Sequence, residues 1–210
     1  MRLVLASASP RRREILSALR IPFEVVIPEV EELADGVPEE VVVENARRKA
    51  AAGLRAAGEA AESVAESAAQ AAEGATALGV DTEVVLDGRL LGKAAVRTEA
   101  RERLEALGGR THTVLSGIVL QGAAPSGGAP VERSGVARTE VTFRELDPTT
   151  LEAYLASGEW HDRAGAYAIQ GLGSILVERV EGDFSNVVGL PVRLLLDLAP
   201  ELLAPPSSNP

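Results

Sequence analysis

A strand is expected to turn into a helix within one stretch of the chain, Leu3-Val4-Leu5-Ala6-Ser7-Ala8-Ser9-Pro10-Arg11-Arg12-Arg13. The apolar run at its beginning predicts a strand. Ser9 and Pro10 are residue types preferred at the N-cap and at the first position of a helix. Ile15, Leu16 and Leu19 then recur at the spacing of one helix face. We therefore predict a strand, a tight turn and a helix that begins at Pro10.

The same stretch has the chemistry of an anion site. Free N–H groups and the dipole at a helix N-terminus favour negative charge, and arginine side chains add bidentate contacts to phosphate oxygens. The alternative is a capped surface helix whose arginines, Arg11, Arg12 and Arg13, are solvated. On this stretch alone, both interpretations stay open.

Composition argues against several classes of protein. The 210 residues contain no cysteine, which excludes disulfides, a thiol nucleophile and a thiolate metal site. Two histidines, His112 and His161, argue against a histidine-rich zinc site. No run approaches the ~20 apolar residues of a membrane span, and no signal peptide is visible. The net charge of -10 argues against nucleic acid or an anionic membrane as a partner. We expect a cytoplasmic protein.

Apolar periodicity predicts alternating strands and helices along the chain. Strands are expected at 23–27, 76–86, 111–120, 131–143 and 175–180. Helices are expected to begin at Pro38, Thr98 and Pro148, and the first of these carries Val41, Val42, Asn45, Ala46, Lys49 and Ala50 at helical spacing. On the inner side of this helix Lys49 would bring an ammonium towards a cleft, and the alternative is a solvated lysine. A Gly/Pro-rich loop at 122–130 is expected to join two long strands into a hairpin.

One stretch is low in complexity, from residue 50 to about residue 74. It is mostly Ala, Glu, Ser and Gly, and Leu54 and Val64 are its only large apolar residues. This composition predicts an exposed helical extension or a partly disordered insertion, at about 51–75, with no chemistry of its own. We expect residues 1–204 to form a single domain around it, followed by a disordered tail at 205–210.

Several polar residues stand out as candidates for chemistry. Asp81 lies among apolar strand residues, where a carboxylate is costly unless it is paired or bound to a metal. Its alternative role is a strand-end residue satisfied by local N–H groups. Gln170 has the donor and acceptor needed to bind a base edge, and the alternative is a turn glutamine bonded to its own backbone. His112 alternates with threonines and is expected to face solvent.

Together these pieces resemble the Maf family of nucleoside triphosphate pyrophosphatases, also called septum-formation inhibitor proteins. The matching segments occur in the family's order and span nearly the whole chain. They are Leu5-Ala6-Ser7-Ala8-Ser9-Pro10-Arg11-Arg12, Glu31-Glu32, Lys49-Ala50, Leu78-Gly79-Val80-Asp81-Thr82, Leu91-Gly92-Lys93, Gly158-Glu159-Trp160, Ala164-Gly165-Ala166-Tyr167-Ala168-Ile169-Gln170-Gly171 and Val187-Val188-Gly189-Leu190-Pro191.

The resemblance implies an α/β fold of the Maf/ITPase-like kind: a mixed twisted sheet with flanking helices, in two lobes around a central cleft. It implies hydrolysis of a nucleoside triphosphate between the α and β phosphates, with a divalent metal cation, Mg²⁺ or Mn²⁺. A homodimer is also expected from the family. A 7-methyl-GTP pyrophosphatase, or a non-catalytic nucleotide-binding regulator of cell division, is the alternative function.

The resemblance also implies roles for individual residues. Asp81 matches the family's proposed proton acceptor. Polar cleft positions are matched by Ser7, Arg11, Arg12, Glu32, Lys49 and Lys93. The trio associated with base preference is matched by Arg11, Thr82 and Gln170, in the form of the branch that prefers dTTP and UTP. We therefore expect Asp81, Glu32, Lys49 and Lys93 to be catalytic, and Ser7, Arg11, Arg12, Thr82 and Gln170 to bind substrate.

A metal is expected to help Asp81. A free aspartate, with a pKa of about 3.9, is a weak base at neutral pH. A carboxylate is a better ligand for Mg²⁺, which acidifies a bound water. Our hypothesis is that Asp81 acts on a metal-associated water, with Glu32 as the second metal contact.

The sequence departs from the family's pattern at a few positions. Val80 stands where alanine is common, and Ala94 and Val96 stand where a proline and an aspartate are usual. Arg163 replaces a usual lysine, and the two are not interchangeable at a bidentate site. Arg13 is expected to be a surface residue.

Overall fold

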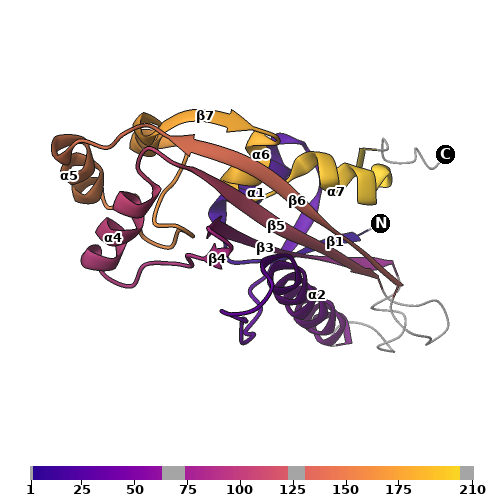
Figure 1. Ribbon diagram of the computed structural model, residues 1–210. Coiled ribbons are helices and arrows are strands. Elements are labelled where there is room, and N and C mark those ends of the chain that lie inside the picture. Colours follow the sequence, from indigo (N-terminus) through magenta and orange to yellow (C-terminus); the bar gives the residue numbers. More distant parts are fainter. Residues whose placement is uncertain (1, 63–73, 123–130, 204–210) are drawn as a thin grey trace.

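A mixed β-sheet forms the centre of the computed structural model, which describes residues 2–62, 74–122 and 131–203 (Figure 1). Within these residues the strand order is β2-β1-β3-β5-β6-β7, with β4 paired to β3. The strands are β1 (Arg2–Ala6), β2 (Phe23–Val26), β3 (Ala75–Leu86), β4 (Arg89–Leu90), β5 (Thr111–Gly122), β6 (Val131–Phe143) and β7 (Val177–Glu181). β1 is parallel to β2 and β3, and the other pairs are antiparallel. The mixed sheet that the resemblance implies is confirmed.

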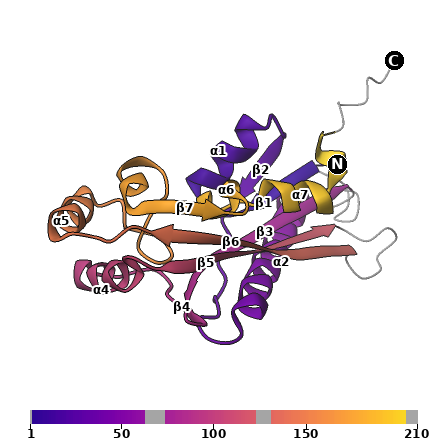
Figure 2. The same cartoon turned by 45° about the horizontal axis from the view of Figure 1, so that its top comes forward.

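Helices cover both faces of this sheet (Figure 1, Figure 2). The longest is α2 (Pro38–Glu62), which packs on one face, and α1 (Pro10–Ala18) and α7 (Val192–Leu198) pack on the other. At one end of the molecule, α4 (Arg97–Leu107) lies beside α5 (Pro148–Ser157). The remaining helices are α6 (Phe184–Val188) and the short 3₁₀ helices η2 (Gly171–Leu176) and η3 (Pro200–Leu203). No helix in the three described ranges is long and apolar enough to cross a membrane.

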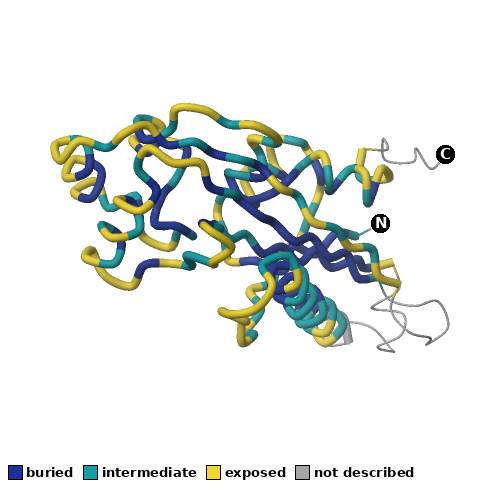
Figure 3. The backbone as a smooth tube through the Cα atoms, in the orientation of Figure 1, coloured by how far each residue is buried: buried dark blue, intermediate teal, exposed yellow. Residues whose placement is uncertain are grey.

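Among the described residues, the core consists of three clusters of buried residues. One cluster lies at the end that carries α4 and α5 and includes Tyr154, Trp160 and Tyr167. Two further clusters lie on the opposite faces of the sheet, one under α1 and α7 and one under α2. Figure 3 shows the buried residues running along the central strands. The cleft described below borders the first cluster, which contributes Val84, Tyr167 and Ile169 to its lining.

Most of the predicted elements are confirmed, with small shifts at their ends. The helix after Ser9 begins at Pro10, and the two long strands β5 and β6 pair antiparallel as predicted. The strand expected at 175–180 begins at Val177, because residues 171–176 form η2. The expected loop at 122–130 and the expected tail at 205–210 lie outside the described residues, apart from Gly122, the last residue of β5.

Small residues bring α2 close to the sheet. A Cβ atom on Gly79 or Gly117 would overlap the α2 backbone, and one on Gly53 would lie 2.7 Å from the Cβ of Ala6. Ala50 and Ala57, on the same helix, are buried. The alanine-rich stretch is helical as far as Glu62, as one of the two expectations has it. It is not an exposed helix throughout, because Gly53 and Ala57 are buried and small side chains there permit close packing. Residues 63–73 lie outside the described residues.

Candidate active site

The candidate site lies at an open edge of β3. β1 pairs with β3 only as far as Ala6 opposite Gly79. On the same edge of β3, β4 and the following residue Leu91 form hydrogen bonds with β3 only from Val84 onward. Residues 80–83 are left without a strand partner there among the described residues. A cleft of about 550 Å³ occupies this place, and all the site residues expected from the sequence line it: Ser7, Arg11, Arg12, Glu32, Lys49, Asp81, Thr82, Lys93 and Gln170.

Asp81 is a buried carboxylate that lines this cleft, with only 4% of its surface exposed. Its Oδ1 accepts a hydrogen bond from Lys49 Nζ at 2.6 Å, and its Oδ2 accepts one from Asn45 Nδ2 at 3.0 Å. Both partners lie one turn apart on α2. Asp81 is therefore not a strand-end residue, because side chains of α2, and not local N–H groups, offset the cost of burying its charge.

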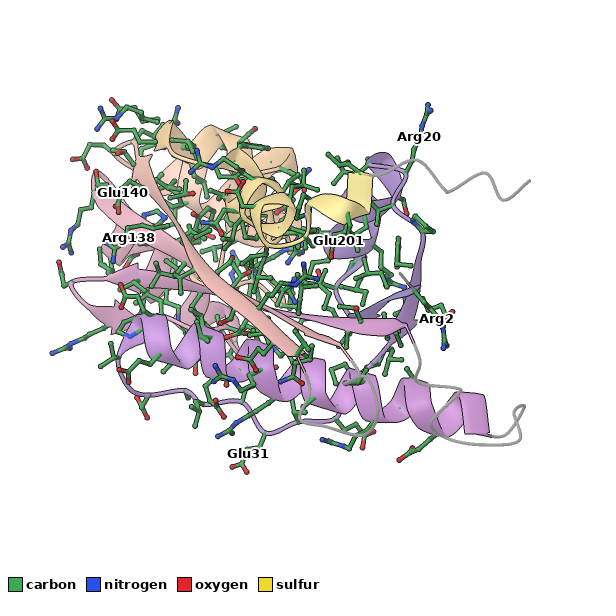
Figure 4. All side chains as sticks on the ribbon, turned by 90° about the vertical axis from the view of Figure 1, so that its right-hand side faces the viewer. Arg2, Arg20, Glu31, Arg138, Glu140 and Glu201 are labelled. Atoms are coloured by element: carbon green, nitrogen blue, oxygen red, sulfur yellow. The ribbon has the colours of Figure 1, made fainter. Side chains whose placement is uncertain are left out.

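Lys49 connects two carboxylates. Its ammonium lies 2.6 Å from Asp81 and 3.1 Å from Glu32. The neighbouring Glu31 is exposed and its side chain points outward (Figure 4). The acidic loop before α2 thus contributes Glu32 to the cleft. Lys49 is buried on the inner face of α2, which decides against the solvated lysine.

Glu83 is a cleft residue that the sequence analysis missed. It lies two positions after Asp81 on β3, so both side chains are on the same face of the strand. Burial, together with the negative charges of Asp81 and Glu32, raises the pKa of Glu83 to about 7. Its Oε2 is buried and has no hydrogen-bond partner. The signal was the Asp-x-Glu alternation within a strand.

Arg12 joins three segments that line the cleft. It is buried, and its Nε donates to the carbonyl of Gly189 at 2.9 Å. Its Nη1 donates to Ser7 Oγ at 2.9 Å and its Nη2 to Thr82 Oγ1 at 3.2 Å. Burial lowers the pKa of Arg12, and the charges of Asp81 and Glu32 act in the opposite direction. Much of the Arg12 fork is thus used within the protein.

The helix start is arranged differently from a simple N-cap. Ser9 occupies the N-cap position of α1, but its side chain makes no capping bond, and its N–H donates to Ser7 Oγ at 3.2 Å. Arg11 is half-buried, lines the cleft and donates from Nε to the carbonyl of Val188 at 3.1 Å. Arg13 is exposed, as expected.

Gln170 and Lys93 also line the cleft. Gln170 is exposed at the N-cap position of η2, and its side chain makes no capping bond. Glu159 instead accepts from the N–H groups of Leu172 and Gly173, both at 3.0 Å. The interpretation of Gln170 as a turn residue bonded to its own backbone is therefore wrong. Lys93 is exposed at the cleft.

His112 is buried, and the expectation that it faces solvent is wrong. Only 2% of its surface is exposed, and its Nε2 lies 2.9 Å from the hydroxyl of Tyr167. Its ring makes edge contacts with Phe143 and Tyr167. Burial lowers its pKa to about 4. Alternation along β5 could not show that a distant segment, which includes the cleft residue Tyr167, covers this face.

Comparison with known proteins agrees with this architecture. The dTTP/UTP pyrophosphatase of Thermococcus gammatolerans is 43% identical over 198 residues, which cover 93% of this chain and 94% of the relative. That of Moorella thermoacetica is 44% identical over 197 residues (91% and 90%), and that of Bacillus cytotoxicus 40% over 195 residues (92% and 91%). The family model described as Maf-like protein matches residues 2–202. Since this match includes every described strand and every segment that lines the cleft, the chain belongs to the Maf-like protein family.

Proposed function

We propose that the chain hydrolyses dTTP and UTP between the α and β phosphates, releasing the nucleoside monophosphate and pyrophosphate. The observation that carries the proposal is Asp81, a buried carboxylate on the open edge of β3 that two α2 side chains hold in place. The names of the relatives support the substrate. The volume of the cleft, about 550 Å³, is within the range of small-molecule sites.

In this proposal Asp81 orients the attacking water. Each of its oxygens accepts one hydrogen bond from the protein, and a carboxylate oxygen has two lone pairs. It can therefore accept a further bond from a water at the cleft, while Lys49 and Asn45 keep it from rotating. Positioning of this kind is a main source of rate in phosphoryl transfer.

The cations of the cleft balance the charge of the substrate. Arg11, Lys49 and Lys93 line the cleft, and preorganised positive charge stabilises the negative charge that develops on the phosphate oxygens. Lys49 is already shared by Asp81 and Glu32. We assign the phosphate contacts to Arg11 and Lys93 and the fixing of Asp81 to Lys49. Arg12 holds Ser7, Thr82 and the Gly189 carbonyl in position.

The carboxylates of the cleft fit a divalent cation whose remaining ligands come from the phosphates of the substrate. Asp81, Glu83 and Glu32 offer hard oxygen donors of the kind that Mg²⁺ and Mn²⁺ prefer. The buried, unpartnered Oε2 of Glu83 is an oxygen available to a ligand. Among the described residues no group of three such side chains could hold a metal by itself. Mg²⁺ is usually held by one or two carboxylates plus substrate phosphates. When bound, the cation supplies charge neutralisation and a more acidic water.

Base preference is assigned to Gln170, Arg11 and Thr82. Gln170 has an unbonded amide at the cleft, suited to the edge of a pyrimidine. Thr82 is 2.8 Å from Ser116 Oγ and accepts from Arg12, so it shapes the pocket. A wrong base leaves buried polar groups unpaired, which discriminates strongly. A substrate panel in which 7-methyl-GTP is a better substrate than dTTP and UTP would contradict this assignment.

The test is an assay of pyrophosphate release from dTTP and UTP with Mg²⁺ or Mn²⁺, with product analysis that separates pyrophosphate from phosphate. We expect Asp81→Asn to lower the rate by about 10²-fold or more. The matched control is Asp87→Asn, the same change at the exposed turn after β3, which is expected to leave the rate unchanged. Near wild-type hydrolysis by Asp81→Asn would overturn the role of this carboxylate. Nucleotide binding without turnover would favour a regulator.

The partners in this proposal are the nucleotide substrate and a second copy of the chain, with no nucleic acid. The net charge of -10 disfavours a nucleic-acid partner. A salt-titrated DNA-binding assay tests for a nucleic-acid partner, and light scattering tests whether two copies of the chain associate.

A further inference from the structure

Arg163 is a cleft arginine that no side chain or carbonyl of the described residues satisfies. It lines the cleft, and its Nε is buried without a hydrogen-bond partner. Burial lowers the pKa of the Arg163 guanidinium, and no acidic group acts in the opposite direction. Arg12 differs, because its guanidinium donates hydrogen bonds to Ser7 and Thr82. Burial lowers the pKa of Arg12, but the charges of Asp81 and Glu32 act in the opposite direction.

The backbone holds Arg163 in place by an uncommon local conformation. Asp162, Gly165 and Ala166 all have left-handed backbone, with φ of 54°, 64° and 60°. This conformation is costly for residues other than glycine. A Cβ on Gly165 would lie 2.9 Å from the side chain of Val84, so only glycine fits against β3 there.

This segment also lies beside Lys93. Ala164 forms an antiparallel bridge with Lys93, and the N–H of Gly165 donates to the carbonyl of Gly92 at 2.8 Å. Burial raises the pKa of Glu83, and the Lys93 ammonium is near enough to act in the opposite direction. The backbone contacts hold the Lys93 and Arg163 segments together, and both cations line the cleft that Asp81 and Glu83 also line.

A partly buried charge without a partner costs free energy that the free protein does not recover. A strained loop adds to that cost. Both costs are offset if an anion binds between the two cations, since a guanidinium fork matches phosphate oxygens bidentately. Pyrophosphate, the product of the reaction proposed above, is such an anion.

We propose that Arg163, together with Lys93, binds the β and γ phosphates of the substrate as the departing pyrophosphate. The inference rests on the proposed function. As the water oxygen bonds to the α phosphorus, the bond from that phosphorus to the α–β bridging oxygen breaks, and its electron pair stays on pyrophosphate. The proton of the water passes through Asp81 to solvent. Arg163 neutralises the charge that grows on the leaving group.

The experiment compares binding of two products by calorimetric titration, inorganic pyrophosphate and dTMP, each with Mg²⁺. We expect Arg163→Ala to weaken pyrophosphate binding by about 10- to 100-fold, the worth of hydrogen bonds to a charged group. We expect dTMP binding to change by less than about threefold, since each such contact acts on its own phosphate. Arg163→Lys, which keeps the charge but not the fork, is expected to lie between these results.

Arg89→Ala is the matched control, because Arg89 is an exposed arginine on β4, four residues before Lys93, and does not line the cleft. It is expected to bind both products as the wild type does. Thermal unfolding checks that each variant folds. If Arg163→Ala does not fold, Arg163→Lys is used in its place to test pyrophosphate binding. Unchanged pyrophosphate binding in the variant that folds, an equal loss for both products, or no pyrophosphate binding by the wild type would overturn the inference.

The same measurements separate this inference from the proposed function. If the wild type releases no pyrophosphate from dTTP but binds pyrophosphate through Arg163, the anion site stands and the proposed function fails. If the wild type hydrolyses dTTP and Arg163→Ala binds pyrophosphate normally, the proposed function stands and this inference fails.

Discussion

Single side chains of β3 set the electrostatics of the cleft. Asp81 is paired with Lys49 and Asn45, whereas Glu83, on the same face, has a buried oxygen with no partner. Residue types alone identified Asp81 as a candidate, because a carboxylate in an apolar strand is unusual. They did not identify Glu83, because its burial depends on segments distant in the sequence.

Glu83→Gln tests the cost of this unpartnered carboxyl. The folded-state pKa of Glu83, about 7, lies above its reference value of 4.5, so the stability it contributes at low pH is lost as pH rises from 4.5 to 7. Glutamine cannot ionise. The variant is therefore expected to be more stable than the wild type at pH 8 by up to about 3 kcal/mol, and by less than about 1 kcal/mol at pH 5. Urea unfolding at the two pH values measures this. A variant less stable than the wild type at pH 8 would contradict it.

At the scale of elements, the position of α2 on the sheet decides where Asn45 and Lys49 lie. The helix approaches β3 and β5 closely because Gly79 and Gly117 have no Cβ atom to oppose its backbone. Helical spacing predicted the inner face of α2 correctly, since burial follows the period of 3.6 residues. It did not predict that the alanine-rich part would be buried, because small residues are typical both of tight packing and of exposed helices.

Gly79→Ala is expected to move α2. Its Cβ would overlap the carbonyl of Ala46 and lie 2.7 Å from the backbone nitrogen of Ala50, and neither atom can move without the helix. Overpacking of this kind costs about 1–3 kcal/mol, and the shift would disturb the Lys49–Asp81 contact. Chemical denaturation and the pyrophosphate-release assay measure both effects.

Gly58→Ala is the control on the same helix. Nothing lies within 4 Å of a Cβ atom there, so we expect stability to rise by up to about 1 kcal/mol through helix propensity, with activity unchanged. Equal effects of the two substitutions would show that close packing at Gly79 does not set the position of α2.

At the scale of the whole molecule, long strands connect segments that are distant in sequence. β3 and β5 pair along most of their length, and His112 on β5 contacts the segment after α5 through the hydroxyl of Tyr167. This contact buries a neutral imidazole beneath the cleft, and the stability of the whole fold should therefore depend on pH.

His112→Gln tests this dependence. The folded-state pKa of His112, about 4, lies below its reference value of 6.5, so its contribution is present above pH 6.5 and is lost as pH falls towards 4. Between pH 7 and 4.5 the wild type should lose about 2–3 kcal/mol more stability than the variant. Denaturant unfolding at both pH values decides the matter, and parallel losses in the two proteins would contradict the expected role of His112.

Local sequence was enough for the elements and for the order of the motifs. α1 begins at Pro10, and the strands and helices follow one another in the predicted order, as do the motifs that identified the family. Caps, turns and periodicity act over a few residues, so the local sequence is sufficient to predict them. Only the tertiary structure decided that His112 is buried, that Glu83 lies near Lys49, and that Arg163 Nε has no hydrogen-bond partner among the described residues. These depend on which segments cover a strand face or bridge a loop, and a carboxylate or guanidinium acquires its chemistry from neighbours that are distant in sequence.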